Sequence, residues 1–351
     1  MLLECDDISP LFNRKFADFN LKTLVSSLPH GKLGRSRVMP SVSASPTRLK
    51  FWGTRGSISV PGRRTLGYGG NTTCVEVRAD GEIIVLDAGS GIRSLGVALE
   101  KEFHSQPIKL SLLITHAHWD HIQGLPFFAP AYEKKNEIRV RGYDGVDMSF
   151  GEIMAEPMKA PFFPIAMREL SARIDIKKLT EMEFSFGKVQ VQARFVNHPG
   201  VCAGYRLFTS AGSIAFLPDH EPYQFLHSAR DSDMSPEERK KIAEQERIAL
   251  VDFLHGSDIL ILDAQYTDAE YETHVGWGHG SVSSAVLLAL DAKVRRLLLF
   301  HHDPSHDDTM LDAMVADARR LIRERGKDLE VDGAREGEEV LLPADHANRC
   351  K

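Results

Sequence analysis

Hydrophobic residues recur along the chain from about residue 49 onward in short runs and alternations. Runs rich in Val, Ile and Leu that are bounded by Gly, Asp, Asn or Pro are typical of β-strands. The pattern predicts strands at Cys74–Val77, Ile83–Leu86, Leu110–Ile114, Ile138–Val140, Val189–Val196, Ile214–Leu217, Ile259–Leu262 and Val294–Phe300. A turn at Ala79-Asp80-Gly81 joins the first two.

Three segments have helical patterns instead, namely Ser235–Leu254, Val282–Leu290 and Asp307–Arg325. The first opens on Ser-Pro-Glu-Glu, which combines a cap, a proline at the first helical position and an acidic first turn. The last begins with Asp and ends in Arg, as the helix dipole favours. Strands dominate the first half of the chain and alternate with helices in the second. This order predicts an α/β fold, an αββα sandwich of two mixed sheets flanked by helices.

Residues 1–47 lack this regularity. Gly31–Thr47 is basic and rich in Ser and Pro, which indicates a linker. Ile8–Leu28 has helix-like Phe and Leu spacing, so a docked helix and a half-ordered tail both stay open. We expect an N-terminal segment and linker over 1–47 and one large domain over 48–351, with an insertion around 148–179.

Composition narrows the class of protein. The chain has 351 residues, of which 26% are charged and 42% hydrophobic, as in soluble globular proteins. A net charge of −6 disfavours a general nucleic-acid coat protein. No apolar run approaches the ~20 residues of a membrane span, and the N-terminus lacks signal-peptide features. Four scattered cysteines without a Cys-x-x-Cys pair fit a reducing cytoplasm.

Histidine is the outlier, with fifteen copies and one dense cluster. The spacing of His116, His118, Asp120 and His121 would arise by chance in roughly two of a thousand such sequences. His116 and His118 end a strand two residues apart, so both rings can project the same way. Asp120 and His121 lie around the following turn, so their side chains can reach a second, adjacent metal position. Imidazole and carboxylate donors together suit Zn, Fe, Mn or Ni.

One cluster cannot complete two metal shells, so further ligands must come from other strand ends. His198, Asp219, His301 and His302 each follow a hydrophobic strand directly or closely. Taken alone, each of these residues would more often be an ordinary loop residue than a metal ligand. Their shared position after a strand makes all of them candidates.

These residues resemble the metallo-β-lactamase fold, and within it the branch that contains ribonuclease Z and related phosphodiesterases. The resemblance runs from about Phe51 to Asp308. Its motifs are the glycine-rich opening Phe51–Gly56, the Leu86-Asp87-Ala88-Gly89 motif, the His116–His121 cluster, the Ile261–Tyr266 segment, Gly278-His279-Gly280-Ser281, and Leu299-Phe300-His301.

The resemblance implies a ligand set for two divalent metal ions, with zinc expected first and Mn or Fe as alternatives. One metal takes His116, His118 and His198, the other takes Asp120, His121 and His301, and Asp219 bridges them. His301 is preferred to His302, which stays an alternative. The catalytic residues are Asp120, His279 as the acid that protonates the leaving group, and Asp263, which orients His279 although the family has Glu there. Asp87 supports a ligand histidine.

Two such metals would hold a bridging hydroxide that attacks a phosphodiester. The apolar insertion Met148–Leu179 suggests a lid or pocket wall, a homodimer contact, or local core filling. A lid would favour a small substrate, and we expect a 3′,5′-cyclic nucleotide. Arg55 and Arg206 are candidate phosphate clamps because guanidinium matches phosphate oxygens.

The sequence is therefore consistent with three functions. The first is a binuclear phosphodiesterase acting on a cyclic nucleotide, with nucleic acid the less expected partner. The second is a ribonuclease Z-like endonuclease. The third is a non-catalytic metal- or ligand-binding sensor that signals through residues 1–47. A lactonase or thioesterase is a weaker fourth, because His279 points to phosphate.

Overall fold

The computed structural model describes residues 46–227 and 234–342. The predictions for Ile8–Leu28, and for the linker up to residue 45, lie outside these residues, as does the sensor hypothesis that depends on them. Thr47, the last residue of the predicted linker, already opens the first strand. No helix within the described part of the chain combines the length and apolarity needed to cross a bilayer.

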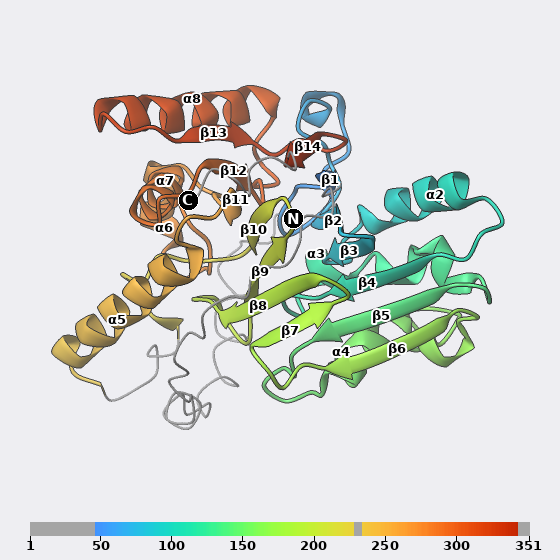
Figure 1. Ribbon diagram of the computed structural model, residues 1–351. Helices are drawn as coiled ribbons and strands as arrows, with labels where there is room; N and C mark the ends of the chain where they lie inside the picture. Colours follow the sequence, from blue (N-terminus) through green and yellow to red (C-terminus); the bar gives the residue numbers. More distant parts are fainter. Residues whose placement is uncertain (1–45, 228–233, 343–351) are drawn as a thin grey trace, which may run out of the picture.

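Two seven-stranded mixed sheets form the centre of the molecule (Figure 1). The first has the order β14 (Glu339–Leu342), β1 (Thr47–Gly53), β2 (Cys74–Ala79), β3 (Glu82–Leu86), β4 (Lys109–Leu113), β5 (Glu137–Gly142) and β6 (Arg173–Lys178). The second has the order β13 (Glu330–Gly333), β12 (Arg296–Phe300), β11 (Ile259–Asp263), β10 (Gly212–Leu217), β9 (Ala203–Thr209), β8 (Val189–Phe195) and β7 (Glu183–Phe186).

Helices cover the outer faces of both sheets. They are α2 (Ile92–Phe103), α4 (Phe150–Ala155), α5 (Pro236–Leu254), α7 (Val282–Asp291) and α8 (Asp308–Glu324). Two short helices, α3 (Trp119–Ile122) and α6 (Asp268–His274), lie in the connections after β4 and β11. Short 3-10 turns lie at 63–65, 125–127, 129–132, 156–158 and 167–169. Figure 1 shows α2 and α4 beside the first sheet and α5 to α8 around the second. The predicted αββα sandwich is confirmed.

Three apolar layers hold the sandwich together. The inner layer lies between the sheets, where the ring of Phe300 packs 5.9 Å from Phe51 and 5.7 Å from Phe216. A second layer buries α2 and α4 against the first sheet. A third buries α5, α7 and α8 against the second sheet. Removing this much apolar surface from water is the main favourable contribution to folding.

The insertion around 148–179 contributes several side chains to the core, whereas Phe162 is 79% exposed. Ser149 caps α4 with a reciprocal Glu152 contact, and Met154 and Met158 are each only 1% exposed within the layer outside the first sheet. Its end forms β6, which pairs in parallel with β5. Local core filling, one of the three alternatives for this segment, therefore describes these methionines, and the lid prediction is wrong for them.

Strand direction decides where loops meet. β10, β11 and β12 run parallel to one another, and β8 shares their direction because it is antiparallel to β9, which is antiparallel to β10. In the first sheet, β3 and β4 are parallel. Parallel strands bring their carboxyl ends to one edge, which is the usual place for a site in α/β proteins.

Candidate metal centre

Every predicted site residue after a strand lies at these carboxyl ends. Asp87 follows β3, the His116–His121 segment follows β4, and His198 follows β8. Asp219 follows β10, and His301 follows β12 directly. Six strand ends from two sheets therefore supply one cluster, because Asp263 at the end of β11 joins them.

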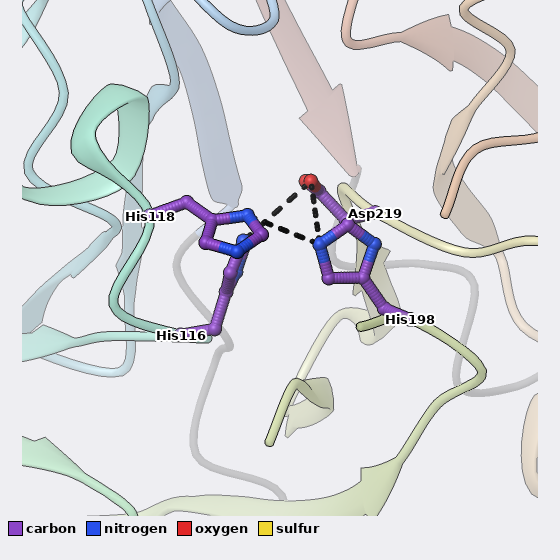
Figure 2. A group of neighbouring side chains, drawn as sticks. All are labelled: His116, His118, His198 and Asp219. Atoms are coloured by element: carbon purple, nitrogen blue, oxygen red, sulfur yellow. Dashed lines mark hydrogen bonds and ion pairs between the residues drawn. The ribbon is translucent and has the colours of Figure 1, made fainter. Parts of the chain in front are cut away.

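The first group consists of His116, His118, His198 and Asp219, whose ligand atoms lie within 4.8 Å of one another. Figure 2 shows ring nitrogens of His118 and His198 pointing toward each other beside a carboxylate oxygen of Asp219, with His116 on the same side as His118. The Nε2 of His198 lies 3.2 Å from the Nδ1 of His118. Three imidazoles that point nitrogens at one spot fit a metal better than they fit one another.

The second group consists of Asp120, His121 and His301. The Oδ2 of Asp120 lies 3.1 Å from the Nε2 of His121 and 3.0 Å from the Nε2 of His301. The two imidazole rings stack with centroids 5.4 Å apart. The backbone amide of Ser57 donates to the same Oδ2 at 2.8 Å, which helps to hold the carboxylate in place.

Asp219 spans the two groups with its two oxygens. Its Oδ2 lies 3.6 Å from the Nε2 of His116 and 3.7 Å from the Nε2 of His198. Its Oδ1 lies 3.1 Å from the Nε2 of His121 and 3.3 Å from the Nε2 of His301. This is the geometry expected of a carboxylate shared by two metals.

Two buried atoms of the cluster lack hydrogen-bond partners, namely the Nε2 of His116 and the Oδ1 of Asp219. Buried polar atoms are nearly always satisfied, so each exception calls for an explanation. Both atoms face the cluster. A pair of divalent cations would satisfy them, and the nitrogen and oxygen donors suit such ions. The residues present therefore fit the implied metals.

Hydrogen bonds on the far side of each ring orient the first ligands. The Nδ1 of His121 lies 2.8 Å from Asp87, which also accepts from the backbone amide and hydroxyl of Thr115. The Thr115 hydroxyl lies 3.0 Å from the Nδ1 of His116. Partners of this kind set the tautomer and aim the opposite nitrogen. Asp87 therefore stands where the sequence places a supporting aspartate.

Two other rings are oriented by partners that the sequence did not reveal. The Nδ1 of His198 lies 2.8 Å from the Gly278 carbonyl. The Nδ1 of His301 lies 2.9 Å from the amide oxygen of Gln265, whose nitrogen in turn donates to Asp303. In both cases the Nε2 is left facing the cluster. The only sequence feature that could have identified Gln265 is its position shortly after the strand β11.

At two positions the backbone lies so close to a histidine ring of the cluster that only glycine fits. A Cβ on Gly56 would lie 2.4 Å from the ring of His301, and a Cβ on Gly278 would lie 2.5 Å from the Nδ1 of His198. Gly278 also has a φ of +95°, which favours glycine. His301 itself adopts a positive φ of 58°. This rare conformation for a non-glycine residue turns the chain sharply at the end of β12.

His302 points away from the cluster. Its Nε2 lies 2.9 Å from the Ala334 carbonyl, and its ring packs edge-on against Tyr68. Burial lowers its pKa to about 3. The structure therefore brings His301 into the cluster and leaves the alternative, His302, in the core.

Burial keeps the imidazoles of the first group neutral. It is the largest cause that lowers the pKa of His116, His118 and His198, the first and last of them well below the ordinary value. Neighbouring imidazoles add to the effect at each position. Neutral imidazole is the form that binds a metal.

The carboxylates stay ionised in the same surroundings. Burial alone would raise the pKa of Asp120 and Asp219. His121 beside Asp120, and His301 and His121 beside Asp219, more than offset this and hold both pKa values well below the usual range. Buried negative charge next to converging nitrogen atoms is a strong feature of a cation site.

His279 borders the cluster and is held by Asp263, as predicted. The Nδ1 of His279 lies 2.8 Å from the Oδ2 of Asp263, and its ring stacks 4.8 Å from that of His301. The side chain of Asp263, which stands where the family has Glu, therefore reaches the His279 ring. Burial alone would lower the pKa of His279, but Asp263 raises it to about 9. Within the described residues, the hydrogen bond of its ring is made by the Nδ1 alone.

The two arginines suggested as phosphate clamps are engaged elsewhere. Arg55 is fully buried and donates to the carbonyls of Gly69, Asp303 and His306. Arg206 donates to the carbonyls at the end of α5 and to Ser213. Both guanidinium groups tie loops together, so the clamp prediction is wrong for both.

Comparisons with known proteins support the same fold. A beta-lactamase superfamily domain matches residues 83–302. The ribonuclease Z of Thermoplasma acidophilum is 23% identical over 316 residues, which cover 82% of this chain and 96% of that protein. Two solved structures share the fold. The metallo-beta-lactamase fold protein YhfI from Bacillus subtilis has a TM-score of 0.57 and 14% identity, covering 84% and 100% of the two chains. The short form of human tRNase Z has a TM-score of 0.54 and 18% identity, covering 84% and 99%.

Proposed function

Because this chain belongs to the beta-lactamase superfamily, we propose that its cluster holds two divalent cations and hydrolyses phosphodiester bonds. The chain is a metal-dependent hydrolase, and the resemblance to this fold seen in the sequence is confirmed. The observation that carries the proposal is the position of Asp219, which faces one group of ligand atoms with each oxygen.

Seven side chains would bind the cations. His116, His118 and His198 would hold one, Asp120, His121 and His301 the other, and Asp219 would touch both. Zinc is the first candidate metal, with manganese or iron as alternatives, because imidazole and carboxylate donors accept all three. When bound, two such ions supply Lewis acidity and lower the pKa of water enough to provide a nucleophile at neutral pH.

His279 would supply the proton that the leaving alkoxide needs. Its Nδ1 is occupied by Asp263, so only the Nε2 can face the substrate. A leaving ribose oxygen is strongly basic and departs more readily when protonated, and a positioned imidazolium is a common donor. Asp263 keeps that imidazolium charged and aimed.

RNA is the substrate class that the relatives favour. The relatives named ribonuclease Z match this chain along 94–96% of their length in the first three cases. The identity of 23–24% leaves room for a different substrate. The proposed activity is thus endonucleolytic cleavage of RNA by the cluster described above.

A 3′,5′-cyclic nucleotide is the second candidate, and the charge of the chain favours it. A polyanion is held by many Lys and Arg contacts, whereas this chain carries a net charge of −6. Met154 and Met158 of the insertion are buried in the core, so these two side chains do not support this substrate. A cytoplasmic location is part of the proposal, supported by free, buried Cys74 and Cys202.

A substrate panel tests the proposal. We expect the full chain, supplied with zinc or manganese, to hydrolyse bis-p-nitrophenyl phosphate and to cleave a precursor tRNA faster than 3′,5′-cyclic AMP. The Asp219→Asn variant is the negative control for contaminating nucleases. Hydrolysis of a lactone with no turnover of any phosphodiester would contradict the proposal, and turnover of cyclic AMP alone would assign the second candidate.

A further inference from the structure

Trp277 lies two residues before His279 in the loop ahead of α7 and is largely exposed. Its side chain is 62% accessible, which is unusual for the largest apolar side chain. It directly precedes Gly278, whose carbonyl orients His198. Successive Cα atoms are about 3.8 Å apart, so its backbone is within about 8 Å of that of His279.

A buried carboxylate holds the loop that carries this tryptophan. Glu221 is completely buried. One of its oxygens accepts from the backbone amide of Gly276 at 2.6 Å, and the other accepts from the amide of Gly278 at 2.8 Å. The residues on both sides of Trp277 are therefore fixed by one side chain.

Glu221 is itself held by three side chains from other parts of the chain. The hydroxyl of Tyr271 donates to it at 3.1 Å, and the Nε2 of His227 lies 2.6 Å away. The side chain of Asn197, which precedes His198, donates to the Glu221 carbonyl at 3.0 Å. Burying a carboxylate costs free energy unless it is well hydrogen-bonded, so a buried acceptor with four partners indicates a position that must be held.

The ring of Trp277 is also supported from one side. It packs edge-on against His274, with centroids 4.8 Å apart. His274 stacks on Tyr266 at 4.6 Å, and Tyr266 lies edge-on to His279 at 6.1 Å. A row of rings thus joins Trp277 to the proposed acid. The ring is anchored while most of its surface remains in water.

We propose that Trp277 is a binding platform on which a nucleobase of the substrate stacks. This inference rests on the proposed phosphodiesterase function. An anchored, exposed indole next to a phosphodiester site suits a flat aromatic ring attached to the phosphate through a sugar, and such stacking tolerates any base. RNA and a cyclic nucleotide both offer this chemistry. A second exposed indole, Trp119, is 61% exposed and lies between His118 and Asp120 in the chain.

Two chromogenic diesters that share a leaving group test the platform. Uridine 5′-(p-nitrophenyl phosphate) carries a nucleobase, and methyl p-nitrophenyl phosphate does not. We expect Trp277→Ala to lower kcat/KM for the uridine diester about 5- to 100-fold more than for the methyl diester, mainly through KM. Trp277→Phe should restore part of this preference. Ile248→Ala, which removes an exposed apolar side chain on α5, should leave both substrates unaffected.

The outcomes separate failure of the platform from failure of the function. Equal losses on both diesters, or no loss on either, in Trp277→Ala would overturn the platform while the wild-type protein still shows phosphodiesterase activity. A wild-type protein that cleaves neither diester, RNA nor cyclic AMP would remove the function itself. Repeating the comparison with single-stranded RNA and with cyclic AMP identifies the source of the base, as a larger KM effect on one of them.

Discussion

Asp219→Asn is expected to lower phosphodiester turnover by more than about 100-fold with the fold intact. Loss of a hydrogen-bond partner behind a metal ligand already costs about 10- to 100-fold, and Asp219 faces both ligand groups directly. Asparagine keeps the shape of the side chain but removes the charge that offsets the surrounding imidazoles. The measurement is kcat on bis-p-nitrophenyl phosphate, with circular dichroism and thermal unfolding as checks on folding.

A matched aspartate provides the control. Asp258 lies just before β11 and accepts from the Ser213 amide at 2.9 Å, at the opposite end of the strands from the cluster. Asp258→Asn should retain most of the activity, whatever it does to stability. If Asp219→Asn kept more than half of the wild-type turnover, Asp219 could not be the shared ligand.

His279→Ala is expected to separate substrates by their leaving group. For RNA or cyclic AMP, removal of a general acid should cost about 10²- to 10⁴-fold in kcat. For bis-p-nitrophenyl phosphate the loss should be much smaller, because p-nitrophenolate leaves without a proton. His255→Ala, at an exposed histidine after α5, is the control. Equal losses on both kinds of substrate would remove the acid role from His279.

The pH profile gives the same prediction a second readout. Asp263 raises the pKa of His279 to about 9, although burial opposes it. Such a group is protonated, and active as an acid, below its pKa and loses the proton as pH rises through it. Bound cations repel the imidazolium, so we expect the alkaline limb of kcat on RNA below pH 9. The limb should be absent with the p-nitrophenyl ester and move to lower pH in Asp263→Asn.

Much of the sandwich could be predicted because many of its strands are buried and therefore appear in the sequence as short runs of apolar residues. β4, β10, β11 and β12 all stand within a residue or two of their predicted limits. β6 and β7 were missed because they are short edge strands whose exposed faces carry Arg, Lys and Glu, which obscures the alternation. α2 was missed although Ile92, Leu95 and Leu99 form its buried face.

The cluster was predictable to the extent that chemistry shows in local patterns. A histidine motif or a polar residue after an apolar strand is visible in the sequence, and the structure brings those residues together. Gln265 and Glu221 could not be found in this way. Both act through hydrogen bonds to segments far along the chain, and nothing near them in sequence marks those contacts. The lid hypothesis is wrong for Met154 and Met158 for a related reason, since apolar residues alone do not say which surface they cover.

The content of bound metal tests the central claim most directly. We predict about two equivalents of divalent metal per chain, measured by elemental analysis after purification or after loading of chelator-treated protein with zinc or manganese. Asp219→Asn should bind measurably less, and Asp258→Asn should match the wild type. A wild-type protein that folds normally yet takes up no metal from either buffer would contradict the account.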